Sequence, residues 1–314
     1  MKVIVAGANG LIGKALVRAL RARGDEVALL VRHLEGTQEW APGATALPWD
    51  GRSPGLWERN VDGADAVINL AGASVAGKRW SPEYKKQILE SRTQSTAAIV
   101  GAIRKAVRKP RVLVNASAVG YYGARGTEPL DESAAPGTDF LAGVVKAWEE
   151  AARCDALGVR TVMVRTGVVL AREGGALQQM VPPFRAFVGG PIGSGAQWFP
   201  WIHLTDEVAV FLWALDHDDL SGPVNAVAPH GQTSKEFSRT LGKVLHRPSW
   251  APLPAAALKV ILGEFATVLT EGQNPVPAAL VKSGFQFRFT DSEAALADLL
   301  VSHAARPAPV EARP

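Results

Sequence analysis

The 314-residue sequence predicts an α/β fold, with a doubly wound parallel sheet and a smaller C-terminal cap. Three observations predict it. Short apolar runs alternate with helical patterns through the first half, these runs are continuous rather than alternating in polarity, and a glycine-rich turn joins the first run to the first helix. Continuous apolar runs indicate strands that helices cover on both faces, as in parallel sheets.

Five apolar runs in the first half predict the strands of this sheet. They occupy residues 2–6, 26–31, 66–70, 111–116 and 161–165. Helical 3–4 spacing fills the segments between them. The first helix begins near Leu11 and ends before Gly24, a second begins after Ser81 and runs to about residue 107, and a third covers residues 138–152. Serine is a favoured first capping residue, and glycine commonly follows the last turn of a helix.

The pattern changes after about residue 170, where we expect the cap to begin. The first domain is predicted to cover residues 1–170 and the cap residues 171–303, with part of the cap (about 198–230) returning to the first domain. Residues 304–314 are rich in Ala and Pro, which predicts a disordered tail. The predicted elements of the cap are a helix over 206–217 capped by Thr205, a strand over 223–228, a helix over 234–246 capped by Thr233 or Ser234, a helix over 252–269, and an edge strand at FQFRF (285–289).

Composition excludes several classes of protein. Hydrophobic residues make up 47% and charged residues 20%, as in ordinary globular domains. Lys and Arg exceed Asp and Glu by four but are scattered, which disfavours nucleic-acid binding. The single cysteine, Cys154, is expected in the core, and no spacing of His, Cys, Asp and Glu suggests a metal site. The N-terminus has no signal-peptide layout and no apolar run is long enough to span a membrane, so we expect a cytoplasmic protein.

A phosphate-binding loop is predicted at VIVAGANGLIGKAL. Gly7, Gly10 and Gly13 stand between a strand and an amphipathic helix, where backbone amides at a helix N-terminus bind a pyrophosphate. Their spacing is G-x-x-G-x-x-G, and the alternative interpretation is a tight structural turn. The residues inside the loop that we expect to contact a dinucleotide are Asn9, Leu11 and Ile12. The first domain is therefore predicted to be a dinucleotide-binding (Rossmann) domain.

The end of the second strand indicates which dinucleotide binds. Arg32 and His33 stand there, and no acidic residue follows until Glu35. An acid at this place selects NAD by binding the ribose 2′-hydroxyl, whereas a guanidinium suits the 2′-phosphate of NADP. NADP(H) is therefore favoured, although an exposed arginine at a strand end is the simpler alternative.

Two later segments add candidate cofactor contacts. Asp50, in LPWDG, is expected near the adenine. Leu70, Ala71 and Gly72 end the motif VINLAG of the predicted strand 66–70, where small residues allow the nicotinamide ribose to approach. Ordinary turn chemistry explains either segment equally well.

The motifs together resemble the short-chain dehydrogenase/reductase superfamily of the extended type, and within it the "epimerase family protein" group of atypical members. The resemblance covers residues 1–298 and rests on these motifs: VIVAGANGLIG, VINLAG, AGKRW, ESRTQST, NASAVGYYG, VRTGVVL, GGPIGSGAQWFPWIHLTDEV and SGPVNAVAP. It implies NADP(H) binding with an unsettled reaction. Through the motifs ESRTQST and VRTGVVL it adds Arg92, Arg165 and Thr166 to the candidate cofactor contacts.

The superfamily's catalytic pair is missing from the expected helix. In such reductases a tyrosine donates the proton and a lysine four residues later lowers its pKa, but here Phe140 is followed by Val144. A phenol with a pKa of about 10 needs roughly 4 kcal/mol of stabilisation to ionise near pH 7. Four residues after Tyr84, Tyr121 and Tyr122 stand Ile88, Arg125 and Gly126, so no Tyr-x-x-x-Lys exists anywhere in the chain.

Four residues are candidate substitutes. Ser117 ends a strand near the place of the superfamily's serine, and Tyr121 and Tyr122 follow it; Lys146 lies on the right helix but two positions late. The alternatives are loop packing for the tyrosines and a solvated helix face for the lysine. His203 is a weaker candidate acid, because a histidine before a helix often serves a local hydrogen bond. Lys78 and Arg79, with Arg92, are candidates for an anionic substrate, and Trp198 and Trp201 for a stacking wall.

Two functions follow from these observations. The first is an NADP(H)-dependent oxidoreductase or epimerase-type protein acting on a small carbonyl or sugar-like substrate, with Ser117 polarising the carbonyl. The second is a non-catalytic NADPH-binding sensor or assembly protein, which the missing pair favours. A small molecule is the expected partner, neither nucleic acid nor membrane is expected, and the oligomeric state is left open between monomer and homodimer.

Overall fold

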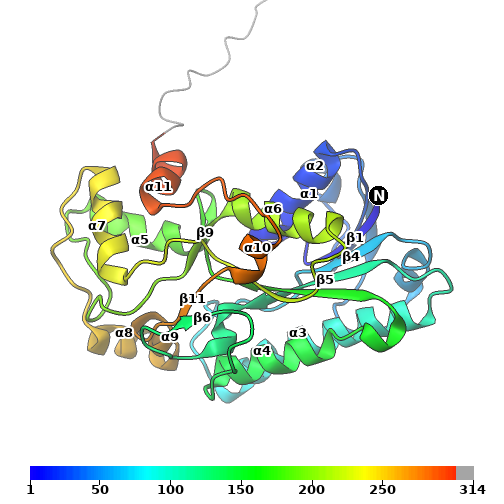
Figure 1. Cartoon of the computed structure of the whole chain (residues 1–314), viewed down its shortest axis with the longest axis horizontal. Coiled ribbons are helices and arrows are strands. Elements are labelled where there is room, and N and C mark those ends of the chain that lie inside the picture. Colours follow the sequence, from blue (N-terminus) through cyan, green and yellow to red (C-terminus); the bar gives the residue numbers. More distant parts are fainter. Residues whose placement is uncertain (302–314) are drawn as a thin grey trace, which may run out of the picture.

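A computed structural model describes residues 1–301, so the predicted tail at 304–314 lies outside the described residues. Two lobes stand side by side: a sheet flanked by helices, and a smaller lobe that holds α5, α7, α8, α9 and α11 (Figure 1). Among the described residues no helix is long and apolar enough to cross a membrane.

A seven-stranded parallel sheet forms the larger lobe, as predicted. In spatial order its strands are β10 (Gly222–Ala226), β7 (Arg160–Thr166), β5 (Val112–Ala118), β4 (Ala66–Asn69), β1 (Lys2–Ala6), β2 (Glu26–Val31) and β3 (Thr45–Pro48). Every neighbouring pair is parallel. The chain order reverses direction between β1 and β4, and ligands of such sheets bind beside the carboxyl ends of the strands at this reversal.

Helices cover both faces of the sheet (Figure 1). On one face lie α1 (Leu11–Ala22), α6 (Leu204–Asp216) and α10 (Ala278–Lys282), and on the other α3 (Pro82–Lys105) and α4 (Phe140–Ala151). Leu16 and Phe211 pack on the first face and Ile99 and Ile103 on the second, all fully buried. Burial on both faces explains why the strand sequences are continuously apolar.

The smaller lobe has its own apolar core. Its helices are α5 (Gly175–Arg185), α7 (Ser234–Leu245), α8 (Ala255–Leu262), α9 (Ala266–Thr270) and α11 (Ser292–Leu300). Phe184, Phe237 and Leu296 pack in this core. Two small parallel sheets lie outside the main sheet: β8 (Val168–Ala171) with β9 (Trp201–His203), and β6 (Pro129–Leu130) with β11 (Asn274–Pro275). The short helix α2 (Thr37–Trp40) follows β2. The domain boundary at residue 170 stays a prediction.

Three predicted elements of the cap are corrected. The helix over 252–269 is broken at Gly263, whose φ of +64° is left-handed and ends α8. The segment 285–289 is not a strand, because the amides of Arg288 and Phe289 donate to the carboxylate of Asp206 instead of a sheet. His203 rather than Thr205 caps α6: its Nδ1 accepts from the amide of Thr205 at 3.1 Å.

Two predicted caps are confirmed. The hydroxyl of Ser81 accepts from the amide of Tyr84 at the start of α3. Thr233 begins α7 in a capping box with Glu236, in which each side chain binds the other residue's backbone.

Candidate functional site

The glycine loop after β1 sits at the point where the strand order reverses. Gly7 has a φ of +76°, and a Cβ there would lie 2.5 Å from the carbonyl carbon of Leu70; a Cβ on Gly13 would lie 2.5 Å from the oxygen of Gly7. Only glycine fits at either position. Gly10 precedes α1, and no side chain caps the first turn of that helix. Its free amides make this an anion-binding helix N-terminus.

The end of β2 presents a basic side chain to solvent beside this loop. Arg32 and His33 are exposed, and the Arg32 guanidinium has no ion pair or hydrogen bond within residues 1–301. Asp50 follows β3, but its carboxylate accepts three hydrogen bonds from Arg52 and Ser53. The bonds from Ser53 lower the pKa of Asp50 to about 2. Asp50 therefore shapes its own turn.

A buried amide network holds the loop that follows β4. Asn69 Nδ2 donates to Asn115 at 2.7 Å and to Thr96 at 2.9 Å, and its Oδ1 accepts from the amide of Ala71. The roles of Asn69, Asn115 and Thr96 were not predicted from the sequence. An asparagine inside an otherwise apolar strand was the available signal, because a buried polar side chain needs hydrogen-bond partners. Gly72 continues the loop and packs against Arg92, whose Cγ would lie 3.2 Å from a Cβ there.

Arg92 holds the same loop rather than facing solvent. Its Nη1 donates to the carbonyls of Ala73 and Ile88, both at 3.0 Å, and its guanidinium lies 5.0 Å from the ring centroid of Trp148. Burial lowers the pKa of Arg92 to about 10. Arg92 is thus placed to support the loop at residues 70–72. Its guanidinium is engaged by these backbone carbonyls, and an anionic substrate has to compete with them for it.

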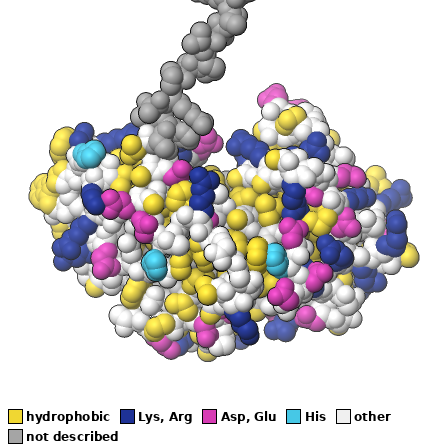
Figure 2. All heavy atoms as spheres, turned by 45° about the horizontal axis from the view of Figure 1, so that its top comes forward, with side chains coloured by type: hydrophobic (Ala, Val, Ile, Leu, Met, Phe, Trp, Pro, Cys, Tyr) yellow, Lys and Arg dark blue, Asp and Glu magenta, His cyan; other side chains and the backbone are white. Residues whose placement is uncertain are grey.

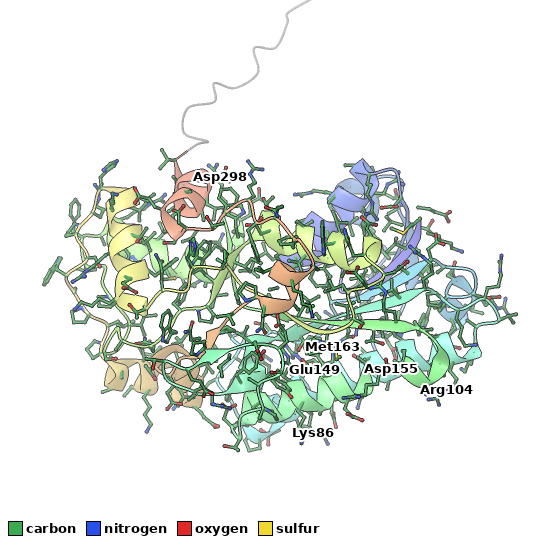
Figure 3. The ribbon with its side chains drawn as sticks, in the orientation of Figure 1. Lys86, Arg104, Glu149, Asp155, Met163 and Asp298 are labelled. Carbon is green, nitrogen blue, oxygen red and sulfur yellow. The ribbon has the colours of Figure 1, made fainter. Side chains whose placement is uncertain are left out.

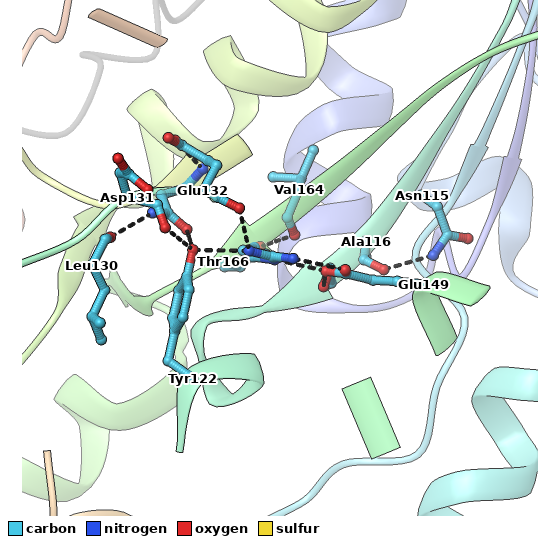
Figure 4. A network of polar contacts seen from close by, with 12 residues as sticks. Asn115, Ala116, Tyr122, Leu130, Asp131, Glu132, Glu149, Val164 and Thr166 are labelled. Carbon is cyan, nitrogen blue, oxygen red and sulfur yellow. Dashed lines mark hydrogen bonds and ion pairs between the residues drawn. The ribbon is translucent and has the colours of Figure 1, made fainter. Parts of the chain in front are cut away.

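Ser117 on β5 and Arg165 on β7 meet Glu149 of α4. Glu149 points from α4 toward the sheet (Figures 3 and 4). The Ser117 hydroxyl donates to Glu149 Oε1 at 2.6 Å. Arg165 donates to both oxygens of Glu149, from Nε at 2.8 Å and from Nη2 at 2.9 Å. Ser117 is 4% exposed and Arg165 is 2% exposed, so all three are removed from water. The Ser117 hydroxyl already has a charged acceptor.

Tyr122 extends this network toward β10 (Figure 4). Its hydroxyl accepts from Arg165 Nη1 at 2.9 Å and donates to Asn225 Oδ1 at 2.7 Å. The side chain is fully buried, and burial raises the pKa of Tyr122 to about 12. A tyrosine that donates a proton readily near pH 7 needs the opposite shift of its pKa. Tyr121 stacks on Arg165, with 3.5 Å between the guanidinium carbon and the ring centroid.

Two carboxylates, half-buried Glu132 and buried Glu207, hold neighbouring elements together beside this network. Glu132 accepts from the amides of Asn225 at 2.9 Å and Ala279 at 3.1 Å, and burial raises its pKa. Thr166, at the end of β7, donates to Glu207 Oε1 at 2.7 Å. Burial raises the pKa of Glu207 to about 8, and its Oε2 has no hydrogen-bond partner among the described residues. Thr166 is therefore also engaged within the protein.

Phe140 and Val144, the positions at which we expected the superfamily's tyrosine and lysine, carry apolar side chains. The Phe140 ring meets Trp80 edge-on, with 5.0 Å between centroids. Val144 is 3% exposed and packs with Tyr84 and Ile88. Lys146 lies on the exposed face of α4. The structure therefore does not bring Lys146 together with Ser117.

The remaining candidates have structural contacts. His203 is buried, which lowers its pKa to about 4, and it caps α6. Arg79 donates to the carbonyl of Val260, whereas Lys78 is exposed. Trp201 is 1% exposed, and the indole Nε1 atoms of Trp198 and Trp201 have no partner in the described part of the chain.

A cleft opens to solvent between the two lobes. Gly120, Gly123, Phe140 and Trp80 line it from the larger lobe. The cap contributes α9 and the segment that follows it, which lie beside the N-terminal end of α4 (Figure 1). Phe140, where we expected the superfamily's tyrosine from the sequence, therefore borders the cleft.

Two family models match the chain. The model of the "NAD dependent epimerase/dehydratase family" matches residues 3–227, and that of a "Domain of unknown function (DUF1731)" matches residues 253–299. The Arabidopsis thaliana "Epimerase family protein SDR39U1 homolog, chloroplastic" is 42% identical over 291 residues, 92% of this chain and 84% of that protein. The Bacillus subtilis "Epimerase family protein YfhF" is 37% identical over 304 residues, 96% and 98% of the two chains.

Two solved structures are similar over nearly the whole of this chain. The human epimerase family protein SDR39U1 (isoform 2), crystallised with NADPH, has a TM-score of 0.85 at 38% identity, covering 95% of this chain and 99% of that chain. The nucleoside-diphosphate sugar epimerase from Corynebacterium glutamicum has a TM-score of 0.76 at 32% identity, covering 96% of this chain and 58% of that chain.

Proposed function

The chain belongs to the NAD dependent epimerase/dehydratase family, and from this premise we propose that it binds NADP(H). We further propose that it is a short-chain dehydrogenase/reductase-like oxidoreductase or epimerase-type protein acting on a small carbonyl or sugar-like substrate. The glycine loop at the strand-order reversal carries the proposal, because Gly7 and Gly13 leave no room for a side chain and Gly10 opens α1 to an anion.

Preference for NADP(H) over NAD(H) rests on Arg32. Its guanidinium is exposed at the end of β2, without a partner within residues 1–301, and the human relative was crystallised with NADPH. A planar guanidinium donates paired hydrogen bonds to a phosphate, so Arg32 offers the 2′-phosphate a charged donor. His33 stands beside it and is equally exposed.

A fluorescence titration with NADPH and NADH tests the cofactor. We expect tight NADPH binding, weaker NADH binding, and a loss of about 10-fold or more in NADPH affinity alone in Arg32→Ala, since a charge-assisted contact is worth about 1.5–3 kcal/mol. Arg239→Ala, on the exposed face of α7 in the cap, is the matched control and should bind both nucleotides like the wild type. Absence of saturable binding by either nucleotide would refute the proposal.

The non-catalytic alternative has specific support. The Ser117 hydroxyl and the Tyr122 hydroxyl are both committed to buried partners, and Phe140 and Val144 supply neither proton nor charge. A protein with these features retains cofactor binding but lacks a positioned acid. The absence of such an acid typically lowers the rate of the chemical step 10²–10⁴-fold. The catalytic roles of Ser117, Tyr121, Tyr122 and Lys146 stay predictions, and a water in the cleft is the donor that the oxidoreductase hypothesis then requires.

Slow NADPH oxidation separates the two hypotheses. A panel of small carbonyl compounds is assayed with the wild type and with Ser117→Ala, whose NADPH affinity is measured in parallel. Turnover that disappears in Ser117→Ala at unchanged NADPH affinity supports the oxidoreductase. Tight NADPH binding without turnover on any compound supports the sensor or assembly protein.

Two further expectations concern the surroundings of the protein. Lys and Arg side chains lie among Asp and Glu side chains on the face that carries α1, α6 and α11, which supports a small-molecule partner rather than nucleic acid (Figure 2). We infer a cytoplasmic location from the sequence; the Arabidopsis relative is named chloroplastic.

A further inference from the structure

Three large apolar side chains are exposed together at the outer end of the smaller lobe. Phe187 and Val188 follow α5 and are each 54% exposed, and Trp250, in the segment that follows α7, is 67% exposed. Backbone hydrogen bonds join the two segments, because the amides of Trp250 and Ala251 both donate to the carbonyl of Gly189. The segment after α7 runs along the end of this lobe that is farthest from the sheet (Figure 1).

Two arginines border these apolar side chains. The guanidinium carbon of Arg247 lies 4.5 Å from the ring centroid of Phe187, and Arg185, two residues before Phe187, is exposed. Neither arginine forms an ion pair with a carboxylate of residues 1–301. We call the five residues Arg185, Phe187, Val188, Arg247 and Trp250 the cap tip.

The stretches of sequence that form the cap tip contain no acidic residue. Between Glu173 and Asp206, and again between Glu236 and Glu264, the sequence holds no Asp or Glu. These two stretches supply α5, α8, most of α7 and both segments of the cap tip. The cap tip therefore combines exposed apolar surface with positive charge that no ion pair compensates.

Phe187 has an unfavourable backbone conformation. Its φ of +62° is left-handed, and glycine is the usual residue in this conformation after the last turn of a helix. The amide of Phe187 donates to the carbonyl of Phe184 and that of Val188 to Pro183, which closes the end of α5. A phenylalanine here costs stability, and a ring that stays largely in solvent returns little of it. Folding alone therefore does not account for this side chain.

Trp250 has no unpaired polar group that would oppose its removal from water. Its Nε1 donates to the carbonyl of Phe187 at 2.9 Å, so the same bond holds the two segments of the cap tip together. An N–H group that enters an apolar layer without an acceptor costs free energy. Because this one is already paired within the protein, the exposed ring of Trp250 meets no such penalty.

We propose that the cap tip attaches this protein to the surface of an anionic lipid bilayer. Its two arginines are attracted to acidic headgroups, while Phe187, Val188 and Trp250 enter the boundary between headgroups and acyl chains. Like charges oppose the pairing of two cap tips, which disfavours a second copy of the chain as the occupant. The cap tip lines neither the cleft between the lobes nor the cavity beside Trp198 and Trp201, so it suits a flat layer better than a partner that needs a groove.

Attachment to a bilayer surface goes beyond the proposed function and is independent of it. From the sequence we expected no membrane partner, because no apolar run is long enough to span a bilayer, but attachment to its surface requires no such run. The glycine loop that carries the cofactor proposal lies in the larger lobe, whereas the cap tip lies in the smaller one. NADPH affinity should therefore not depend on the cap tip.

Co-sedimentation of the full chain with lipid vesicles tests the proposal. Phosphatidylcholine vesicles, with and without phosphatidylserine, are titrated at low and at high salt. We expect at least about 10-fold tighter binding when phosphatidylserine is present, since each arginine beside an anionic surface contributes about 5-fold. High salt should remove most of this preference, because it screens the charges.

Phe187→Gly separates attachment from folding. Glycine fits a φ of +62°, so this variant should unfold at the wild-type temperature or above it and still bind anionic vesicles about 5-fold more weakly. Trp250→Ala should weaken binding by at least as much, and Arg185→Gln by about 5-fold on anionic vesicles only. Leu56→Ala and Arg18→Gln, at exposed positions of the larger lobe, are the matched controls and should bind like the wild type.

Several outcomes would overturn the proposal. They are no sedimentation with vesicles that contain phosphatidylserine, equal binding to phosphatidylcholine alone, and unchanged binding in both Phe187→Gly and Trp250→Ala. Polyglutamate that binds as tightly as the anionic vesicles would assign the cap tip to an acidic protein instead. A dimer that light scattering detects without lipid, and that Trp250→Ala dissociates, would assign it to a second copy of the chain. NADPH titration of the same variants should give the wild-type affinity, so a failure of the proposed function is measured separately.

Discussion

Arg165 on β7 and Glu149 on α4 form a two-pronged ion pair, with N···O distances of 2.8 and 2.9 Å, in a place removed from water. The pair ties α4 to the strand beside it. Because Phe140 begins the same helix and lines the cleft, this contact helps to fix one wall of the candidate site.

Breaking the pair should cost much of the protein's stability. Glu149→Ala leaves the Arg165 guanidinium buried without its counter-charge, so we expect a loss of about 3–5 kcal/mol in the free energy of unfolding in urea. The double variant Glu149→Leu with Arg165→Met is the control and should be more stable than Glu149→Ala, because no charge is then left buried. A loss below about 1 kcal/mol in Glu149→Ala would contradict this account.

The two adjacent tyrosines should respond differently to removal of the hydroxyl. Tyr122→Phe takes a buried partner from Arg165 and Asn225, so we expect a loss of about 2–3 kcal/mol. The hydroxyl of Tyr121 has no hydrogen-bond partner among the described residues, and Tyr121→Phe keeps the ring that stacks on Arg165. It should stay within about 0.5 kcal/mol of wild type. Equal effects in the two unfolding curves would contradict the assignment.

Introducing the tyrosine and lysine expected at positions 140 and 144 should be tolerated at the first position and should destabilise the protein at the second. Phe140 is half-buried at the start of α4, so Phe140→Tyr should be tolerated within about 1 kcal/mol. Val144 is 3% exposed in an apolar cluster, and Val144→Lys would bury an ammonium group at a cost of about 3 kcal/mol or more. Thermal unfolding of both single variants measures the difference, and a stable Val144→Lys protein would show that the cluster opens to solvent.

Two glycines of the loop should separate stability from cofactor affinity. Gly7→Ala forces a Cβ to within 2.5 Å of backbone at a φ of +76°, so it should destabilise the protein and abolish NADPH binding. Gly10 has an ordinary φ of −72°, and a Cβ there would meet only the oxygen of Gly7 at 3.5 Å. Gly10→Ala should keep wild-type stability and still weaken NADPH by about 10-fold, because the methyl group stands where the pyrophosphate approaches. Unchanged NADPH affinity in Gly10→Ala would place the pyrophosphate elsewhere.

Glu207 should make stability fall as the pH rises. Burial raises its folded-state pKa to about 8, above the value of about 4.5 in the unfolded chain. Between these values the folded state holds a proton that the unfolded state lacks, so stability is full below about pH 4.5 and is lost as the pH rises toward 8. Glu207→Gln does not titrate, and its stability relative to wild type should increase by about 3–4 kcal/mol between pH 5 and pH 8. Other groups titrate in both proteins and cancel in this difference.

The sequence predicted the sheet because its signals are local. Continuous apolar runs gave five of the seven strands and the later strand over 223–228, while four-residue β3, which begins with Thr and ends with Pro, and two-residue β6 and β11 were not predicted. The glycine loop was also predicted from the sequence. Glycine between a strand and a helix indicates a backbone conformation, or a close approach of another group, that other residues do not allow. The edge strand at 285–289 was wrong because Asp206, distant in sequence, takes the amides that a strand would have used.

The sequence alone did not predict the hydrogen-bond partners of the candidate side chains. Ser117, Tyr122 and Arg165 were chosen for their positions in motifs, but only the folded chain shows that Glu149 and Asn225 accept their hydrogen bonds. The absence of Tyr-x-x-x-Lys was determined by the sequence alone. That Val144 packs with Tyr84 and Ile88 of another helix, and that Asp139 and Glu271 line one cleft, was decided by tertiary structure, because these residues are distant in sequence and become neighbours only when the chain folds.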